Sequence, residues 1–528
     1  MGMRIGDILT DAALARPDGV AITLGDRALT FAEMDRRTDA TARALASVGV
    51  GHRDVVAWWS STSLRAVDGF FACARLGAPV APLNPQLPEG ELRPILDYLA
   101  PRLLVADVAH AAAAGRVAGQ LDVPLAVTGL ADEPGEDPEA LEAARAVVAA
   151  GAVDLDAGTD DAMTTPTGSG AAQVGPPGGP DDGEPHVIYL TSGTTGRPKG
   201  VVVSHRASWL RSSAGGGSFT VPWRGRQGLV TCFPLFHYAG WHYVMEAWQN
   251  RVADHLVRRA SAEEMVAVVE RWRPTAMYCI PAVWERVLAA EHDGADLTSI
   301  RCADVGTSPT STDLLSRIRR RLPQSALRVM YGSTEAGHTT TLADWDVDDH
   351  PGSVGQAAPP SVVRVDDTGE VLVWGATLMD GYLHLPDQTA EALADGWYHT
   401  GDLGRMDDDG FLTITGRRRD VIRTGGETVA PPQVEAALRD HPTVAEVAVV
   451  GLPDDAFGEV VCAVLVVLDG QRPPTVEELR AHVAGRLPSP AQPRRVAVVD
   501  ALPHTDATGQ VQRALVRAML LVDTATDG

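Results

Sequence analysis

The residues best suited to chemistry form a loop rich in glycine and hydroxyl side chains that ends in a lysine. It reads Tyr189-Leu-Thr-Ser-Gly-Thr-Thr-Gly-Arg-Pro-Lys-Gly200. Gly193 and Gly196 allow a tight turn with inward-pointing backbone N–H groups, which suits phosphate binding. Lys199, the single lysine of the chain, adds a mobile cation. The sequence therefore predicts a triphosphate loop, although it lacks the GxxxxGK[ST] pattern. Its further donors are the hydroxyls of Thr191, Ser192, Thr194 and Thr195.

Five further motifs follow this loop, and their order is as informative as their content. They are Phe233-Pro-Leu-Phe-His-Tyr-Ala-Gly240, Val305-Gly-Thr-Ser-Pro309, Tyr331-Gly-Ser-Thr-Glu335, Tyr398-His-Thr-Gly-Asp-Leu-Gly404 and Gly416-Arg-Arg-Arg-Asp420. With these motifs the chain resembles the adenylate-forming superfamily of acyl-CoA synthetases, adenylation domains and luciferases. Its pattern is most similar to that of bacterial acyl- or aryl-CoA ligases.

The resemblance implies an ATP and Mg²⁺ site. In that site Tyr331 stacks on adenine, Thr334 contacts the α-phosphate, and Glu335 ligates Mg²⁺, whose charge offsets that of the departing pyrophosphate. Asp402 and Arg417 are implied to bind the ribose. The remaining implied nucleotide contacts are Gly306, Thr307 and Gly332.

The resemblance also implies an acyl pocket and a route for a thiol such as CoA. His237 borders the pocket and the phosphates, with Tyr238 and Gly240 beside it. Gly425 and Gly426 line the thiol tunnel. With Lys199, Thr334 and Glu335, His237 completes the predicted catalytic group of the N-terminal part.

One position departs from the family pattern. The C-terminal loop reads Pro503-His-Thr-Asp-Ala-Thr-Gly-Gln-Val-Gln-Arg513, so Gln510 stands where the family has a catalytic lysine. Losing one cation aimed at developing charge costs roughly a hundred- to a thousand-fold in rate. Arg513 could reach in, but a guanidinium is not interchangeable with an ammonium. The first half-reaction is therefore expected to be slow, supported by another group, or different in kind.

The elements around the motifs predict an α/β protein. Helical patterns at 32–48 and 64–76 alternate with strand patterns at 54–59 and 78–82, which is typical of a parallel sheet. A further strand at 186–190 leads into the glycine-rich loop. After Arg419, helices at 432–439 and 476–486 and strands at 444–452 and 460–468 indicate a compact α+β domain.

The domain organisation follows from the pattern and the resemblance together. An N-terminal domain, 1–418, is expected to hold two sheets flanked by helices plus a small barrel-like part. A smaller, mobile C-terminal domain, 420–528, is expected to rotate about a hinge at Arg419 between two half-reactions. The Gly/Pro-rich stretch 151–185 is predicted to be a flexible linker.

Composition excludes several classes of function. A net charge of −24 argues against a nucleic acid or an anionic membrane surface as partner. The five cysteines lack metal-type spacing and are expected to be buried thiols in a reducing cytoplasm. The N-terminus lacks a signal-peptide core, so a cytoplasmic protein is expected, as monomer or homodimer.

Three functions remain open. The first is activation of a short or aromatic acid as acyl-AMP and its transfer to CoA or to a carrier protein, because bulky residues crowd 238–248. An α-amino acid is not expected, since the position that would bind its amine lacks a carboxylate. The second is a secondary-metabolism enzyme that forms amides or activates nitrite for diazotisation of an aryl amine. The third is a non-catalytic nucleotide-binding protein.

Overall fold

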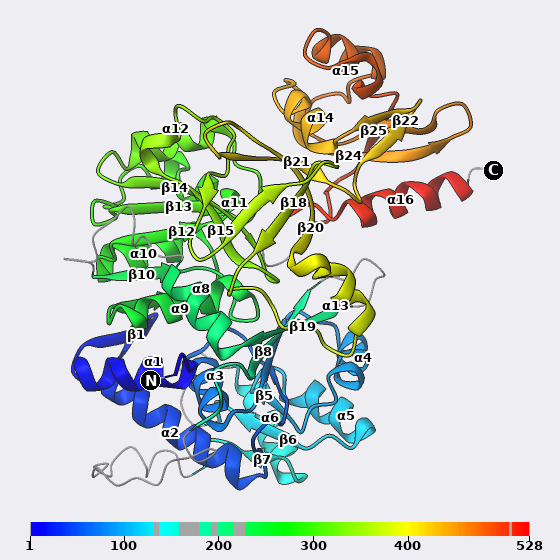
Figure 1. Cartoon of the computed structure of the whole chain (residues 1–528). Helices are drawn as coiled ribbons and strands as arrows, with labels where there is room; N and C mark the ends of the chain where they lie inside the picture. The colour runs from blue at the N-terminus through cyan, green and yellow to red at the C-terminus, as the bar shows by residue number, and fades with distance from the viewer. Residues whose placement is uncertain are drawn as a thin grey trace. The chain divides into compact units, whose positions relative to one another are not determined.

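The computed structural model divides the chain into two compact units (Figure 1). The N-terminal unit comprises Met1–Asp349, Ala357–Val362 and Trp374–Tyr398. The C-terminal unit comprises His350–Gln356, Val363–Val373 and His399–Gly528. The residues that the structure describes are 2–130, 137–157, 179–191, 198–214, 227–505 and 509–526.

An eight-stranded sheet of the N-terminal unit has the order β19-β9-β8-β4-β3-β5-β6-β7. Its neighbours from β8 to β7 pair in parallel, whereas β9 is antiparallel to both β8 and β19. The hairpin of β8 and β9 thus carries the glycine-rich loop. The strands are β3 (Val56–Trp59), β4 (Val80–Leu83), β5 (Leu103–Asp107), β6 (Leu125–Thr128), β7 (Val153–Asp154), β8 (Pro185–Thr191), β9 (Lys199–Ser204) and β19 (Gly381–Tyr382).

A second sheet of this unit contains β15-β14-β13-β12-β10-β11-β1-β2 in that order. Strands β10 to β14 and β1 form its parallel part, and the hairpin of β14 and β15 carries the motif that ends in Glu335. The strands are β1 (Val20–Leu24), β2 (Arg27–Thr30), β10 (Gly228–Thr231), β11 (Ala253–Leu256), β12 (Ala276–Cys279), β13 (Cys302–Gly306), β14 (Ala326–Ser333) and β15 (Gly337–Leu342).

A layer of helices joins the two sheets. Helix α3 packs on β3 and β4, and α9 packs on β10 and β11, while α1 contacts both helices. The rings of Phe70 on α3 and Trp241 on α9 stack with centroids 3.7 Å apart. Thr30 and Glu33 form a capping box that starts α2, and Ser63 caps α3. The helices of this layer are α1 (Ile5–Ala15), α2 (Phe31–Ser47), α3 (Leu64–Leu76), α8 (His205–Ala214) and α9 (Tyr238–Gln249).

Other helices pack on the strands of both sheets. Helices α5 and α6 contact the eight-stranded sheet, α4 packs against α5, and α10, α11 and α12 contact the second sheet. Their bounds are α4 (Glu89–Leu99), α5 (Ala111–Leu121), α6 (Pro138–Ala149), α10 (Ala262–Trp272), α11 (Pro281–Val287), α12 (Thr312–Arg321) and α13 (Pro386–Ala392).

The C-terminal unit contains two sheets of its own. One has four strands in the order β17-β18-β20-β21, and the other has the order β23-β22-β25-β24 with β26 beside β25. Helix α14 packs on β24 and α15, and α16 also packs on β24. Bounds are β16 (Gln356–Ala357), β17 (Val362–Val365), β18 (Glu370–Trp374), β20 (Tyr398–Met406), β21 (Leu412–Arg417), β22 (Ile422–Thr424), β23 (Glu427–Val429), α14 (Pro431–Leu438), β24 (Val444–Asp454), β25 (Gly458–Val467), α15 (Val476–Val483), β26 (Arg495–Val498) and α16 (Arg513–Thr526).

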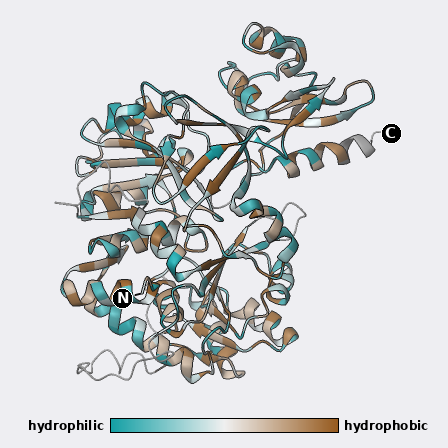
Figure 2. Cartoon of the chain, in the orientation of Figure 1, coloured by the Kyte–Doolittle hydropathy of each residue, from teal (hydrophilic) through white to brown (hydrophobic). Residues whose placement is uncertain are grey.

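The predicted α/β fold with a smaller C-terminal α+β part is confirmed. Figure 2 shows hydrophobic residues along the sheets, where long runs such as β25 are buried. The strands β18, β20 and β21 precede residue 418, yet they group by their contacts with the C-terminal unit. Rotation about Arg419 stays a prediction.

The linker predicted at 151–185 is shorter than expected. Its first part forms β7, and Asp156 is buried, accepting hydrogen bonds from the Thr128 hydroxyl and the Gly129 N–H. Its last part starts β8, whose preceding Glu184 pairs with Arg53. The polar composition of the stretch gave no sign that its two ends are ordered. Residues 158–178 lie outside the described residues. No helix among the described residues has the length and apolar character needed to cross a membrane.

Candidate active site

The two ends of the glycine-rich loop are held by the β8–β9 hairpin. Thr191 and Lys199 are opposite each other in the strand register, and the Thr191 hydroxyl donates to the Lys199 carbonyl at 3.4 Å. Lys199 is the first residue of β9, so the strand pairing fixes the position of its backbone. The intervening predicted phosphate ligands Ser192, Gly193, Thr194, Thr195 and Gly196 lie outside the described residues.

Tyr382 connects Lys199 to Glu335. The Lys199 Nζ lies 4.8 Å from the centroid of the Tyr382 ring, and the Tyr382 hydroxyl donates to Glu335 Oε1 at 3.1 Å. Burial, and then the negative charge of Glu335, raise the pKa of Tyr382, so its hydroxyl keeps its proton. The structure thus brings the predicted cation and the predicted metal ligand to one tyrosine, which the sequence motifs did not single out.

The backbone of the turn that carries Thr334 and Glu335 is held by hydrogen bonds from Arg211. This guanidinium is 1% exposed and donates to the backbone carbonyls of Thr334 at 3.0 Å, Glu335 at 2.8 Å and Thr377 at 2.7 Å. The Glu335 carbonyl also accepts the Met379 N–H at 2.7 Å. Sequence reasoning missed Arg211, because an isolated arginine on a helix gives no sign of which backbone it will meet.

Strand ends bring the predicted adenine contacts together. Gly306 ends β13 opposite Met330 of β14, one residue before Tyr331. A Cβ at Gly306 would lie 2.3 Å from the Met330 carbonyl oxygen, so the close approach requires glycine. Thr307 follows with φ of +67°, a left-handed conformation that turns the chain away from the strand. At Gly332 a Cβ would lie 2.2 Å from the Gly337 carbonyl oxygen.

His237 begins helix α9 as its N-cap. Its Nδ1 accepts the Ala239 N–H at 3.2 Å, and burial lowers its pKa to about 4, so the ring is neutral near pH 7. Gly240 must be small, since a Cβ there would lie 2.8 Å from the Pro234 carbonyl oxygen. The Arg211 guanidinium lies 5.1 Å from the centroid of the Tyr238 ring, so Tyr238 and the Glu335 turn share one anchoring arginine.

The predicted ribose ligands face each other in the C-terminal unit. Asp402 of β20 and Arg417 of β21 are register partners, and Arg417 Nε donates to Asp402 Oδ1 at 3.2 Å. The Asp402 N–H donates to the Thr400 hydroxyl, whose own proton goes to the Val371 carbonyl at 2.7 Å. The carboxylate is thus oriented on a rigid strand pair, as a ligand of two hydroxyls would need to be.

Gly425 and Gly426 form the turn between β22 and β23. Their φ values of +60° and +83° lie in the left-handed region that glycine adopts at little cost. The Gly425 N–H donates to the Phe457 carbonyl at 2.9 Å, which fixes the turn on the neighbouring hairpin. The local geometry explains the two glycines; their role in a thiol tunnel stays a prediction.

The C-terminal loop has the neutral Gln510 at the position of interest, and its Arg513 is paired with carboxylates. The Gln510 N–H donates to the Thr505 hydroxyl at 3.0 Å, and its carbonyl accepts the Thr505 N–H at 2.8 Å. Arg513 donates to both carboxylate oxygens of Glu435, at 2.8 and 2.6 Å, and its Nη1 lies 3.6 Å from Asp420 Oδ2. Because its charge is already paired, Arg513 is a poor replacement for the missing lysine.

Glu335 fits the Mg²⁺ that the resemblance implies. Its carboxylate supplies hard oxygen donors, it is only partly buried, and Oε1 is already oriented by Tyr382. The Arg211 contacts fix the backbone on which this carboxylate is carried. Glu335 would therefore hold the ion, and the phosphate contact of the neighbouring Thr334 stays a prediction.

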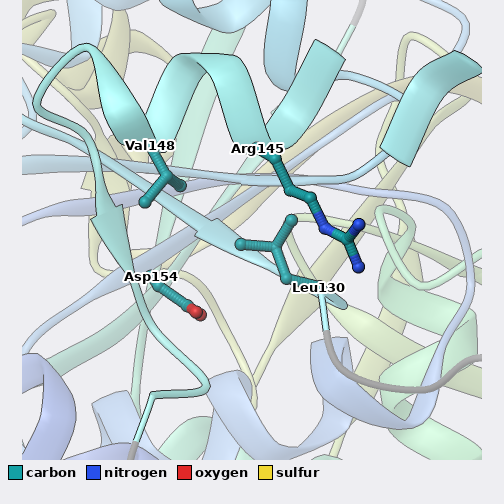
Figure 3. Close-up of a pocket in the computed structure, with 4 residues that line it drawn as sticks. All are labelled: Leu130, Arg145, Val148 and Asp154. Atoms are coloured by element: carbon teal, nitrogen blue, oxygen red, sulfur yellow. The ribbon is translucent and has the colours of Figure 1, made fainter. Parts of the chain in front are cut away.

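A surface cavity of about 210 Å³ lies elsewhere in the N-terminal unit (Figure 3). It is lined by Leu130, Arg145, Val148 and Asp154, which come from α6, β7 and the segment that follows β6. None of these residues belongs to a motif, so the cavity is not assigned to the reaction.

Comparisons with known proteins agree with this arrangement. The AMP-binding enzyme family model matches residues 9–383, and the model of its C-terminal domain matches 433–508. An indoleacetate–CoA ligase from Aromatoleum aromaticum is 32% identical over 98% of both chains. A feruloyl-CoA synthase from Amycolatopsis is 31% identical over 95% of this chain and 96% of its own.

A solved structure is similar over nearly the same length. The amide bond synthetase McbA from Marinactinospora thermotolerans is 26% identical with a TM-score of 0.82, over 98% of this chain and 99% of that one. The family models and the relatives cover both units. The chain therefore belongs to the AMP-binding enzyme family and is an ATP-dependent, adenylate-forming ligase.

Proposed function

We propose that this protein activates an aromatic or short carboxylic acid as an acyl-AMP and transfers the acyl group to a thiol such as CoA. The observation that carries the proposal is the placement of Lys199 and Glu335 on the two sides of Tyr382. The relatives that act on indoleacetate and ferulate support an aromatic acid. The aromatic side chains of α9, including Tyr243 and Trp241, give the same preference.

In the first half-reaction a carboxylate oxygen of the acid attacks the α-phosphorus of ATP, and the bond to pyrophosphate breaks. Lys199 would hold the phosphates by charge, and the Thr334 hydroxyl would donate to the α-phosphate. Mg²⁺, held by Glu335, would supply charge neutralisation for the phosphates. Arg211 keeps the Thr334–Glu335 backbone in place, so the site needs little reorganisation when charge develops.

In the second half-reaction the thiol sulfur attacks the acyl carbon, AMP leaves and the thiol proton passes to a base. Asp402 and Arg417 would hold the ribose of the adenylate, and the Gly425–Gly426 turn would line the thiol's path. Rotation about Arg419 would exchange the loop around Gln510 for this turn. The neutral Gln510 predicts that acyl-AMP formation, rather than thiol transfer, limits turnover.

A second candidate is transfer of the activated group to an amine, or activation of nitrite. It is favoured by Gln510 together with the paired Arg513, which leave the C-terminal loop without the usual cation. The likeness to an amide bond synthetase supports the amine version. Secondary metabolism would be its setting. A non-catalytic role has no such support, because Lys199, Glu335 and Asp402 are all retained.

Pyrophosphate release with Mg²⁺-ATP tests the proposal. The purified protein would be assayed with a panel of aromatic acids, short acids and nitrite, and products would be identified after adding CoA or an amine. Release with an organic acid followed by a thioester supports the main proposal. Release only with nitrite, or product only with an amine, supports the second candidate, and absence of release with every acid contradicts both acid-activating versions.

A further inference from the structure

His338 lies directly beside the predicted nucleotide and acid site. It is the second residue of β15 and pairs with Gly332 of β14 across the turn that carries Thr334 and Glu335. Gly332 is exposed and has no side chain to cover its partner, and His338 as a residue is partly exposed. His338 is therefore one strand pairing away from the turn that carries Thr334 and Glu335.

The hydrogen bonds of the ring fix which nitrogen carries the proton. His338 Nε2 lies 2.9 Å from the Thr340 carbonyl oxygen and 2.9 Å from the Thr341 hydroxyl. A carbonyl oxygen only accepts, so Nε2 must carry the hydrogen. Burial and the positive charge of Arg328 lower the pKa of His338 to about 4, which keeps the ring neutral near pH 7. Nδ1 is therefore a hydrogen-bond acceptor held in one orientation.

This acceptor has no donor in the part of the chain that the structure describes. The Nδ1 atom is buried, and an unpaired buried acceptor carries a desolvation cost that a hydrogen bond from a ligand would offset. The nearby cations are already engaged, since Arg211 donates to three carbonyls and Arg328 pairs with Asp304 at 2.6 and 2.5 Å. Neither is placed to serve Nδ1.

The surroundings are aromatic and equally short of donors. The His242 ring lies 6.5 Å from that of His338, and Tyr243 continues the cluster at 5.0 Å from His242. The Tyr238 hydroxyl contacts His242 Nδ1 at 3.2 Å and accepts the main-chain N–H of His338. These contacts engage the Tyr238 hydroxyl with His242 and with the main chain of His338, and not with Nδ1 of His338.

We propose that the acid substrate carries a hydroxyl or amino substituent that donates a hydrogen bond to Nδ1 of His338. The inference rests on the proposed function and deepens it from an aromatic or short acid to one bearing a donor. The aromatic cluster contacts the body of the acid, while the fixed acceptor selects among acids of similar size. An acid without the donor leaves Nδ1 unpaired, which lowers kcat/KM about ten- to a hundred-fold.

Two variants whose side chains have the same branched shape and the same number of heavy atoms test the inference. His338→Asn keeps a polar amide near the position of Nδ1, whereas His338→Leu removes it. Pyrophosphate release would be measured with matched pairs: benzoate against its hydroxy and amino derivatives, and cinnamate against hydroxycinnamates. The wild type is expected to prefer at least one donor-bearing acid about ten- to a hundred-fold. The Asn variant should keep much of that preference, and the Leu variant should lose it while still using the parent acid.

Three results would overturn the inference: no preference in the wild type, a preference unchanged in the Leu variant, or a preference lost equally in both variants. Failure of the proposed function is separate, because then no acid releases pyrophosphate from any of the three proteins. In that case thermal shifts with Mg²⁺-ATP and the same acids decide. Stabilisation of the wild type, but not of His338→Leu, by donor-bearing acids supports the inference, and equal shifts contradict it.

Discussion

The N-terminal and C-terminal units use their charged groups in opposite ways. In the N-terminal unit a cation and a carboxylate, Lys199 and Glu335, both contact Tyr382, and no ion pair between the two is present among the described residues. In the C-terminal unit Arg513 forms an ion pair with Glu435, and Gln510 is neutral. An ion pair built for structure and a charge kept for a ligand can look alike in sequence, and the difference lies in what each charge already touches.

The largest expected effect comes from Lys199. Lys199→Met should lower pyrophosphate release roughly a thousand-fold, because no other lysine exists to bind phosphate and a preorganised charge is lost. Circular dichroism and thermal melting should stay unchanged, since the side chain is only partly buried. A loss of less than about tenfold would mean that Lys199 is not a phosphate ligand.

The second effect concerns the arginine under the Glu335 turn. Arg211→Gln should reduce pyrophosphate release about a hundred-fold and lower the free energy of unfolding by about 2–4 kcal/mol, because buried carbonyls lose their donor. Arg206→Gln, on the same helix but exposed beside Asp182, is the matched control and should change little. Equal effects of the two substitutions on activity would contradict a positioning role for Arg211.

A third test asks whether the missing positive charge at position 510 limits the rate of acyl-AMP formation. Gln510→Lys should raise pyrophosphate release about ten- to a hundred-fold if the neutral residue limits acyl-AMP formation. Gln512→Lys, two residues away with its amide donating to the His504 carbonyl, controls for added charge in the loop. A decrease in rate on Gln510→Lys would show that the glutamine is adapted to a different first step.

A fourth prediction concerns acid stability, in which the units should also differ. Burial lowers the pKa of His205 in the N-terminal unit to about 4, so the unfolded chain takes up its proton first as the pH falls below about 6.5. Stability from this group is therefore present above pH 6.5 and is lost progressively toward pH 4. Between pH 7 and pH 5 the loss is about 2 kcal/mol per such histidine. His237, His255 and His338, also lowered to about 4, add to it.

Buried carboxyls act in the opposite sense. The pKa of Asp254 is raised by burial to about 7, so its protonated form favours the folded state as the pH falls. The histidines outnumber it, and a net loss is expected. Urea unfolding at pH 7 and pH 5 would measure it, and His205→Asn should reduce the difference by about 2 kcal/mol while preserving an acceptor for the Ile5 N–H. An unchanged difference would show that His205 is protonated in the folded state.

Much of the fold followed from local pattern. The helix expected at 64–76 is α3 with the same bounds, because Ser63 caps its start and Gly77 ends it in a left-handed conformation. The prediction of a linker at 151–185 missed β7, because an edge strand of two residues is too short to show the alternation of polar and apolar residues. The division between units also differed, since which strands share contacts depends on pairing across distant segments.

For the site, the sequence alone determined the residue types: one lysine in a phosphate loop, a carboxylate that ends the motif Tyr331-Gly-Ser-Thr-Glu335, and a glutamine in place of a lysine. Only the tertiary structure decided that Tyr382 joins Lys199 to Glu335, that Arg211 holds the turn, and that Arg513 is already paired. A sequence motif identifies residues of one short segment that together face a ligand. Contacts between segments more than a hundred residues apart, as between Arg211 and Glu335, depend on how the sheets and helices pack, and no local pattern encodes that packing.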